Sequence, residues 1–469
     1  MGKYYLAVDI GASSGRHILG HLENGKIKLE EIYRFENGMD HKDGKLLWNV
    51  DRLFGEILNG MKKCKELGKI PVSMAIDTWA VDYVLLDAQD RILGETYGYR
   101  DHRTDGMDAE TAKILQETEL YAKTGIQKQI FNTIYQLMAV KQKEPEFLQR
   151  AKTLLMLPDY FGFRLTGNKL SEYTNGSTTQ LVNPNTFQWD TDLIRKLGYP
   201  EDIFLPLKMP GTKVGQLLPE IQKEVGFNLE VVLCGSHDTA SAVMAVPQTE
   251  GDGIYISSGT WSLMGIESLK PIINKDAAAA NFTNEGGYDH RFRFLKNIMG
   301  LWMIQSVRHE YNDAYSFAQL CEMAEDSRDF PSRVDVNDPS FLSPDSMVEA
   351  IKQYCQKTGQ PVPESVGELA SVVYRSLAQS YGETVSGLEK IAGRTYDGIH
   401  IIGGGSNAAY LNQLTADATG KTVYAGPGEA TAIGNLLAQM IHAGDLADLK
   451  SARKCVRESF EIKTFAPAK

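Results

Sequence analysis

One segment of the chain, residues 233–242, carries the residue types that enzymes use for proton transfer. Its sequence is LCGSHDTASA: apolar residues that prefer the interior, a glycine turn, a cluster of polar side chains, then small residues suited to a close-packed helix. A carboxylate placed where a buried strand opens into a turn is well positioned to act as a general base. We therefore predict that Asp238 is the catalytic base. His237 beside it either orients a substrate or only supports the turn.

A second feature is a pair of turns built from small residues. Residues 11–16, GASSGR, would let backbone N–H groups and the hydroxyls of Ser13 and Ser14 approach a phosphate closely. Asp9 precedes this turn and is suited to hold Mg²⁺, directly or through water. A plain hairpin explains this segment equally well by itself. The similar turn at residues 257–260, SSGT, favours phosphate binding, since two such turns facing a cleft grip one polyphosphate from both sides.

Three consecutive glycines, residues 403–405, follow the apolar segment 399–402 and precede a predicted helix. Bare backbone at a helix start suits a phosphate or a flat ligand, which favours a nucleotide role over a structural one. Residues 420–422, GKT, imitate the end of a phosphate-binding P-loop. They do not form one, because position 415 is Thr where that motif requires Gly and a strand follows instead of a helix.

Other polar segments suit a sugar. Residues 77–83, DTWAVDY, combine acids that pair with hydroxyls and aromatic rings that cover an apolar sugar face, although a strand edge with capping acids is the alternative. Asn297 and Gln305 lie near a predicted helix start at about residue 300. Their amides read hydroxyls and adenine edges equally well, and each taken alone is more often a helix cap.

The composition limits the class of protein. The chain has 469 residues, a net charge of −11, and 42% hydrophobic and 23% charged residues. This length predicts two domains with a cleft between them. The acidic balance and the lack of a basic block argue against nucleic-acid binding. No signal peptide or apolar span indicates a membrane, and five scattered cysteines fit reduced thiols in the cytoplasm.

The order of predicted elements occurs twice. Strands at 4–10, 16–22 and 27–35, a helix at 51–68 and a strand at 72–79 give β-β-β-α-β, with Asn24-Gly25 as a hairpin turn. Later, strands at 254–256 and 261–265, a helix at 365–393 and a strand at 399–402 repeat much of that order. A helix at 407–420, a strand at 422–425 and a helix at 429–442 follow. We place the linker at 247–253, and 311–364 is predicted to be loops and short helices.

Together these segments resemble the FGGY family of carbohydrate kinases, within the actin-like ATPase superfamily. The motifs that carry the resemblance lie in order over nearly the whole chain, at residues 9–16, 77–83, 156–160, 172–175, 236–242, 257–264, 284–287 and 297–302. The resemblance implies an α/β fold of two ribonuclease-H-like domains around an interdomain cleft. Residues 1–246 would form the sugar-binding domain and residues 247–469 the nucleotide-binding domain.

The resemblance also assigns roles to individual residues. ATP contacts are expected from Ala12, Ser13, Ser14, Gly15, Arg16, Thr260, Gln305, Gly403 and Gly404. Substrate contacts are expected from Asp77, Trp79, Ala80, His237, Asp238, Thr239 and Asn297, and Mg²⁺ is expected at Asp9. Ala80 stands where glycine is usual in the family. The methyl group of Ala80 affects how closely the backbone at this position approaches the sugar.

The activity implied is phosphorylation of L-rhamnulose by ATP at the C1 hydroxyl, with Asp238 as the base. Another sugar or polyol kinase of the family, acting on fuculose, xylulose or glycerol, is the first alternative. A non-catalytic, nucleotide-dependent sugar sensor is the second, less favoured one. The expected partners are the ketose and ATP alone. The oligomeric state stays open, and a monomer is compatible with the sequence.

Overall fold

The structure is a computed structural model that describes residues 2–248 and 253–468. Two compact units divide the chain, and neither is one continuous stretch. The first comprises Met1–Ala245, Glu267–Phe294 and Thr431–Ser459, and the second comprises Val246–Ile266, Leu295–Ala430 and Phe460–Lys469. Residues 249–252 of the predicted linker lie outside the described residues.

The first sheet has six strands in the order β13-β14-β6-β1-β2-β3. Their bounds are β1 Tyr4–Ile10, β2 Ser14–Glu23, β3 Lys26–Glu36, β6 Pro71–Thr78, β13 Lys213–Gln216 and β14 Glu230–Val232. Strands β1, β6 and β14 run parallel, and β2 and β3 continue β1 as an antiparallel meander. Asn24 and Gly25 take the positive φ values of 52° and 75° that the predicted hairpin turn requires.

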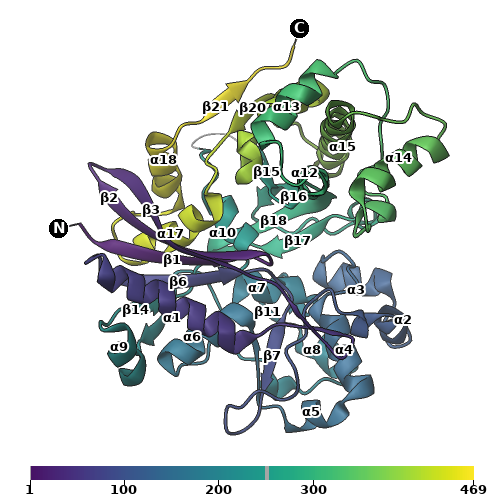
Figure 1. Cartoon of the computed structure of the whole chain (residues 1–469). Coiled ribbons are helices and arrows are strands. Elements are labelled where there is room, and N and C mark those ends of the chain that lie inside the picture. Colours follow the sequence, from purple (N-terminus) through teal and green to yellow (C-terminus); the bar gives the residue numbers. More distant parts are fainter. Residues whose placement is uncertain (1, 249–252, 469) are drawn as a thin grey trace. The chain divides into compact units, whose positions relative to one another are not determined.

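Helices cover both faces of this sheet, which explains why β1 is apolar at almost every position. Leu6, Val8 and Ile10 lie in one core together with buried residues of helix α1, Val50–Glu66. The alternate residues, Tyr5 and Ala7, pack with Ala432, Leu436 and Met440 of helix α17, Ala430–His442. Figure 1 shows α17, in yellow, beside the purple strands. Helix α17, from near the end of the sequence, thus covers the second face of the first sheet.

The second sheet follows the order β17-β18-β16-β15-β19-β20-β21. Its strands are β15 Ile254–Ser258, β16 Trp261–Ser268, β17 Thr283–Gly286, β18 Phe292–Met299, β19 Gly398–Ile402, β20 Thr422–Ala425 and β21 Lys463–Phe465. Strands β15, β19 and β20 run parallel. The order β18-β16-β15-β19-β20-β21 therefore matches β3-β2-β1-β6-β14-β13. The repeated α/β architecture expected from the sequence is confirmed.

The long helix α15 (Val366–Ala392) forms where the sequence predicts it. Ser365 and Glu368 make a capping box at its start, and Gly393 ends it in the left-handed conformation, with φ of 69°. Helices α12 Trp302–Glu310, α13 Phe317–Asp326, α14 Met347–Lys357 and α16 Ala409–Thr419 complete the set in the second unit. Helices α13 and α14 fill the segment predicted as loops and short helices. Strand β21 has no counterpart among the elements predicted from the sequence.

The remaining elements are mostly short. The helices are α2 Met107–Ala112, α3 Glu117–Thr124, α4 Thr133–Lys143, α5 Pro145–Arg150, α6 Leu157–Thr166, α7 Tyr173–Gly176, α8 Thr191–Lys196, α9 Pro219–Val225, α10 Asp238–Met244, α11 Lys275–Ala279 and α18 Leu449–Ser459. The strands are β4 Asp40–Lys42, β5 Lys45–Leu47, β7 Tyr83–Leu86, β8 Thr153–Met156, β9 Ser171–Glu172, β10 Val182–Asn183, β11 Gln188–Trp189 and β12 Leu207–Lys208. Among the described residues, no helix has the length and apolar character needed to cross a bilayer.

Candidate active site

Three carboxylates gather where the parallel strands of the first sheet end. Asp9 and Asp77 are register partners on the adjacent strands β1 and β6. The segment after β14 then pairs with the end of β6: the Thr78 amide donates to the Ser236 carbonyl at 2.9 Å, and Thr78 forms a parallel bridge with His237. Asp238 follows as the first residue of α10. The carboxyl edge of a parallel sheet is where α/β proteins commonly bind ligands.

Asp77 is the most enclosed of the three acids. Its side chain has no solvent exposure, and Asn435 Nδ2 of α17 donates to its Oδ2 at 2.6 Å. Burial raises the pKa of Asp77 well above its ordinary value, and the negative charges of Asp9 and Asp238 raise it further. Its Oδ1 is buried without a hydrogen-bond donor in the described part of the chain. These surroundings favour the protonated form of Asp77.

Asp238 differs because it reaches solvent. Its side chain is 33% exposed, whereas that of His237 is 9% exposed. Desolvation raises the pKa of Asp238 above its ordinary value, and the charge of Asp9 adds to this, while His237 and hydrogen bonds from Thr239 act in the opposite direction. A carboxylate with a raised pKa accepts protons more readily. Asp238 therefore combines access with the basicity that proton abstraction requires.

His237 links Asp238 to a buried ion pair. Its Nε2 lies 3.4 Å from Asp238 Oδ1, and its Nδ1 lies 3.0 Å from Arg293 Nη2 and 3.2 Å from Glu285 Oε2. A guanidinium only donates, so Nδ1 accepts from Arg293 and the ring proton sits on Nε2, facing Asp238. Arg293 also donates from Nε to the Gly286 carbonyl at 2.8 Å. His237 thus orients Asp238 as well as supporting the turn.

The partners Glu285 and Arg293 were missed by sequence reasoning. Arg293 has no solvent exposure, and its Nη2 lies 3.0 Å from Glu285 Oε2. Although burial acts to raise it, the pKa of Glu285 is held below its ordinary value by the charge of Arg293. A single arginine within the apolar segment FRFL, residues 292–295, was the available signal. A charged residue inside a buried strand needs a partner, which directs attention to a nearby carboxylate.

A second buried carboxylate holds the segment before Asp238. Glu172 Oε2 accepts from the Ser236 hydroxyl at 2.6 Å and from the Ser236 amide at 3.2 Å. Its side chain also caps α7, accepting from the amides of Thr174 and Asn175. The Ser236 turn is thereby fixed on both sides, by β6 and by Glu172.

The first small-residue turn lies directly beside Asp9. Arg16 is the register partner of Asp9 across β1 and β2, and its Nη2 donates to Asp9 Oδ2 at 2.6 Å. Asn37 fixes the loop by donating from Nδ2 to the Gly11 carbonyl and from its amide to the Ser13 carbonyl, at 2.8 and 3.0 Å. Ser13 is exposed, and Ala12 and Ser14 are half-buried.

Gly15 has a different setting from the rest of this turn. It lies inside β2, and a Cβ there would come within 2.1 Å of the Phe35 ring. Close packing therefore accounts for this glycine. The strand begins at Ser14 rather than at the predicted Arg16, which leaves the turn shorter than expected.

Hydrogen bonds to the Asp82 side chain hold the segment 79–83 in place. This buried carboxylate accepts from Trp48 Nε1 at 2.6 Å, Trp79 Nε1 at 2.9 Å and Gln136 Nε2 at 3.0 Å, and burial raises its pKa to about 6. The rings of Trp48 and Trp79 lie 4.0 Å apart. The hydrogen bond to Asp82 thus satisfies the indole N–H of Trp79 inside the protein.

Ala80 lies in a tight turn of this segment. The amide of Asp82 donates to the Ala80 carbonyl at 2.9 Å, and the intervening Val81 has φ of 68°. A β-branched residue in this left-handed region is strained and persists only where surrounding contacts hold it. Thr133 supplies one such contact, donating from Oγ1 to the Val81 carbonyl at 2.7 Å.

The predicted nucleotide residues of the second unit converge on the end of β15. The Thr260 carbonyl accepts from the Trp302 amide at 3.1 Å, at the start of the helix that carries Gln305. Gly300 is required there, since a Cβ would lie 2.5 Å from the Trp261 carbonyl carbon. On the other side, Gly403 has φ of 81°, and a Cβ on it would lie 2.9 Å from the Ser258 carbonyl oxygen.

These residues leave polar groups open to a ligand. A Cβ on the exposed Gly404 would meet no atom within 4 Å, so its backbone is accessible. Asn297 Oδ1, Trp302 Nε1 and Ser306 Oγ are buried and have no hydrogen-bond partner within the described ranges. These atoms can form hydrogen bonds with a ligand or with water.

Comparisons with known proteins identify the family. The N-terminal and C-terminal domain models of the FGGY family of carbohydrate kinases match residues 4–245 and 254–443. A protein named rhamnulokinase from Halalkalibacterium halodurans is 54% identical, covering 99% of both chains. Another so named, from Bacillus subtilis, is 46% identical over 99% of this chain and 95% of its own.

Solved structures share the fold at low sequence identity. A xylulose kinase from Lactobacillus acidophilus superposes with a TM-score of 0.80 at 16% identity, covering 99% of this chain and 94% of its own. The glycerol kinase of Plasmodium falciparum with ADP has a TM-score of 0.78 at 14% identity, with the same coverage. The two-domain α/β fold expected from the sequence is confirmed. The chain belongs to the FGGY family of carbohydrate kinases.

Proposed function

We propose that this kinase transfers the γ-phosphoryl group of ATP to the C1 hydroxyl of L-rhamnulose, giving L-rhamnulose 1-phosphate and ADP. The observation that carries the proposal is likeness along nearly the whole chain to proteins named rhamnulokinase, which are 54, 50 and 46% identical. The xylulose and glycerol kinases are similar at only 16 and 14% identity, which supports the fold and not the substrate.

In the proposed mechanism, Asp238 accepts the proton of the C1 hydroxyl as its oxygen attacks the γ-phosphorus. The bond between the C1 oxygen and the γ-phosphorus forms, the bond between the γ-phosphorus and the ADP leaving oxygen breaks, and the hydroxyl proton moves to an Asp238 carboxylate oxygen. His237 Nε2, 3.4 Å from Asp238 Oδ1, helps to orient the carboxylate. Since phosphoryl transfer needs mainly positioning and charge neutralisation, a single well-placed base is sufficient side-chain chemistry.

We assign the nucleotide to residues 247–469 and the sugar to residues 1–246, with two exceptions. The turn residues Ala12, Ser13, Ser14, Gly15 and Arg16 contact phosphate, and Asn297 contacts the ketose. Thr260, Gln305, Gly403 and Gly404 bind the nucleotide, a role supported by the accessible backbone at Gly404. Asp77, Trp79, Ala80, His237 and Thr239 line the sugar site. Trp79 contributes an apolar ring wall, because its N–H is already bound to Asp82.

Asp9 fits the role of a Mg²⁺ ligand. Mg²⁺ prefers oxygen ligands, keeps several waters and needs only one or two protein carboxylates beside substrate phosphates. Asp9 offers such a carboxylate. On the adjacent strand, Oδ1 of Asp77 is buried and has no hydrogen-bond partner among the described residues. When bound, Mg²⁺ would neutralise phosphate charge.

Incubation of the purified protein with ATP, Mg²⁺ and a mixture of ketoses tests the substrate. We expect mass spectrometry to detect a phosphorylated 6-deoxyketose, and ADP release to be fastest with L-rhamnulose. Faster turnover of xylulose, fuculose or glycerol would refute the assignment. ATP hydrolysis that depends on the sugar but leaves it unmodified would point to a sensor. We place the enzyme in the cytoplasm, where ATP is present and the five free cysteines stay reduced.

A further inference from the structure

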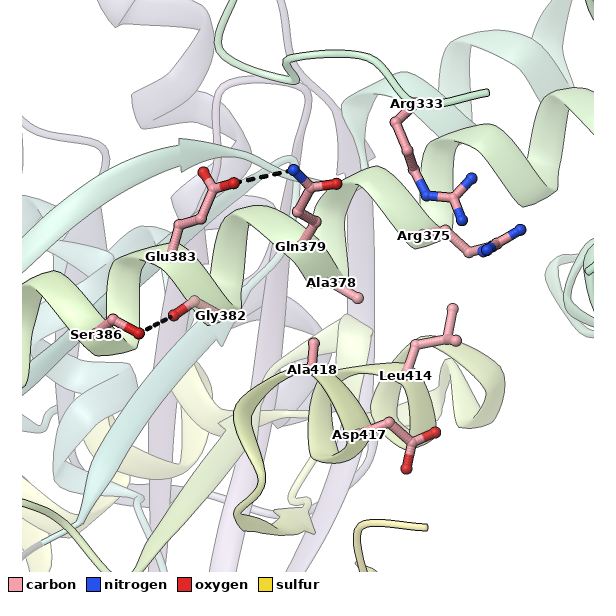
Figure 2. Close-up of a pocket in the computed structure, with 10 residues that line it drawn as sticks. All are labelled: Arg333, Arg375, Ala378, Gln379, Gly382, Glu383, Ser386, Leu414, Asp417 and Ala418. Carbon is pink, nitrogen blue, oxygen red and sulfur yellow. Dashed lines mark hydrogen bonds between the residues drawn. The ribbon is translucent and has the colours of Figure 1, made fainter. Parts of the chain in front are cut away.

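An open groove of about 580 Å³ lies between helices α15 and α16 in the second unit. Figure 2 shows Arg333 and Arg375 at one end, and Glu383 and Ser386 toward the other. The volume is within the range of small-molecule sites, about 300–1,000 Å³.

Small residues form the floor of this groove. Ala378 and Gly382 on α15 face Ala418 on α16, and a Cβ added to Gly382 would lie 3.0 Å from the Ala418 carbonyl oxygen. The two helix backbones therefore approach closely at this point. Without large side chains above them, the groove stays open.

The two arginines carry positive charge, and no carboxylate among the described residues forms an ion pair with them. Arg375 Nη1 donates to the carbonyls of Arg328 and Phe330, the latter at 2.8 Å, and Arg333 Nη1 donates to the Ser332 carbonyl at 2.6 Å. Neither guanidinium forms a salt bridge within the residues that the structure describes. Burial and the charge of Arg375 lower the pKa of Arg333 to about 10, so the Arg333 side chain remains protonated at neutral pH.

The acidic end of the groove does not neutralise this pair. Glu383 lies eight residues after Arg375 on α15, which places it about 12 Å further along the helix axis. Glu383 Oε1 accepts from Gln379 Nε2 at 3.0 Å, and Asp417 Oδ1 accepts from Gln413 Nε2 at 2.9 Å. The groove thus offers a cationic end and, about 12 Å further along α15, the Glu383 carboxylate, which can accept from a hydroxyl group. Asp417 on α16 adds a second carboxylate to the lining.

The groove is also separate from the proposed nucleotide site. Gly403 and Gly404 precede α16, which begins at Ala409. Asp417 lies eight residues into that helix, about 12 Å along its axis.

We propose that this groove is a second ligand site that binds a small phosphorylated polyol, with its phosphate group between Arg333 and Arg375 and its hydroxyls toward Glu383 and Asp417. Guanidinium groups recognise phosphate through charge-assisted, often bidentate hydrogen bonds, and a dianion would relieve the repulsion between the two arginines. The proposal does not depend on which sugar the enzyme phosphorylates.

Calorimetric titration of the full chain, saturated with Mg²⁺ and ADP, tests the site. The two probes are inorganic phosphate and fructose 1-phosphate. We expect both to bind, fructose 1-phosphate at least tenfold tighter, and both at least tenfold weaker in Arg375→Met. The control Arg394→Met removes a charge beyond the end of the same helix and should leave both affinities unchanged. Equal affinity of the two probes would overturn the polyol assignment, and absence of binding by either would overturn the site.

A second pair of variants keeps both arginines and their contacts to the loop carbonyls. Leu414 lines the groove on α16. Leu414→Glu would supply a carboxylate inside the groove to compete with the phosphate, whereas Leu414→Gln has nearly the same shape without the charge. We expect phosphate binding to be lost in Leu414→Glu and retained in Leu414→Gln, with ATP turnover in the absence of the probes equal in both. Equal phosphate affinity in the two variants would overturn the proposal, even if Arg375→Met fails to fold.

Discussion

Replacement of Arg293 by methionine tests the buried ion pair behind His237. Arg293 is fully buried, Glu285 is 9% exposed on its side chain, and the two groups lie 3.0 Å apart. Removing one partner of such a pair leaves an uncompensated buried charge, which costs about 3–5 kcal/mol of stability. Arg293→Met should therefore lower the free energy of unfolding by this amount, and Glu285→Gln should have a comparable effect.

The double variant separates the ion pair from ordinary packing. With both charges removed, neither partner is left uncompensated, so we expect the double variant to lose at least about 2 kcal/mol less than the sum of the single losses. Urea unfolding of the four proteins measures this coupling. Additive losses, within about 0.5 kcal/mol, would refute the account of a coupled buried pair.

The same variants also report on Asp238. Without the Arg293 donor, His237 Nδ1 is free to carry the proton toward Glu285, 3.2 Å away, and Nε2 then has no proton to offer Asp238. We expect kcat of Arg293→Met to fall at least about tenfold, which is less than the whole contribution of a general base to the rate. KM for ATP should change little. A purely structural role would lower stability and leave the turnover of the folded fraction intact.

Three further predictions concern the neighbouring residues. The raised pKa of Asp77 means that this side chain keeps its proton in the native state at pH values where the unfolded chain has lost it. The free energy of unfolding should therefore fall as the pH rises above about 4. Urea unfolding at pH 5 and 8 should show a smaller fall for Asp77→Asn than for the unaltered protein. Gly434→Ala would bring a Cβ to 1.7 Å from the Ser241 carbonyl oxygen and should lower thermal stability by about 3 kcal/mol or more, whereas Gly387→Ala, with open space around its Cβ, should be neutral or stabilising. The raised pKa of Asp238 predicts that kcat/KM declines on the acid side with a midpoint above about 4, and a pH profile with a lower midpoint would contradict the assignment.

Local sequence signals predicted much of the fold because they depend on near neighbours. A few consecutive residues are enough to predict such features as the capping box at Ser365, the Asn24-Gly25 hairpin and the apolar strands. The acids Asp9, Asp77 and Asp238 were also found, since each lies at or just beyond the end of an apolar segment and parallel strands end at one edge. Whether they act on a substrate stays a prediction.

Partners brought by tertiary topology were not predictable in the same way. Helix α17 has a clear amphipathic pattern, but periodicity does not say which sheet it covers, so the bond from Asn435 to Asp77 could not be foreseen. Glu285 and Arg293 come from strands β17 and β18, distant in sequence from His237. Gly15 shows a related limit: its packing against the Phe35 ring could not be foreseen, and its contact with phosphate stays a prediction.

The most direct test of the proposed mechanism is Asp238→Asn, assayed with L-rhamnulose, ATP and Mg²⁺ beside a calorimetric titration of the sugar. The substitution keeps the shape of the side chain and removes its ability to accept a proton, so sugar affinity should stay within a few-fold while kcat falls about 10²- to 10⁴-fold. Turnover near that of the unaltered enzyme, with sugar binding intact, would remove Asp238 from the mechanism.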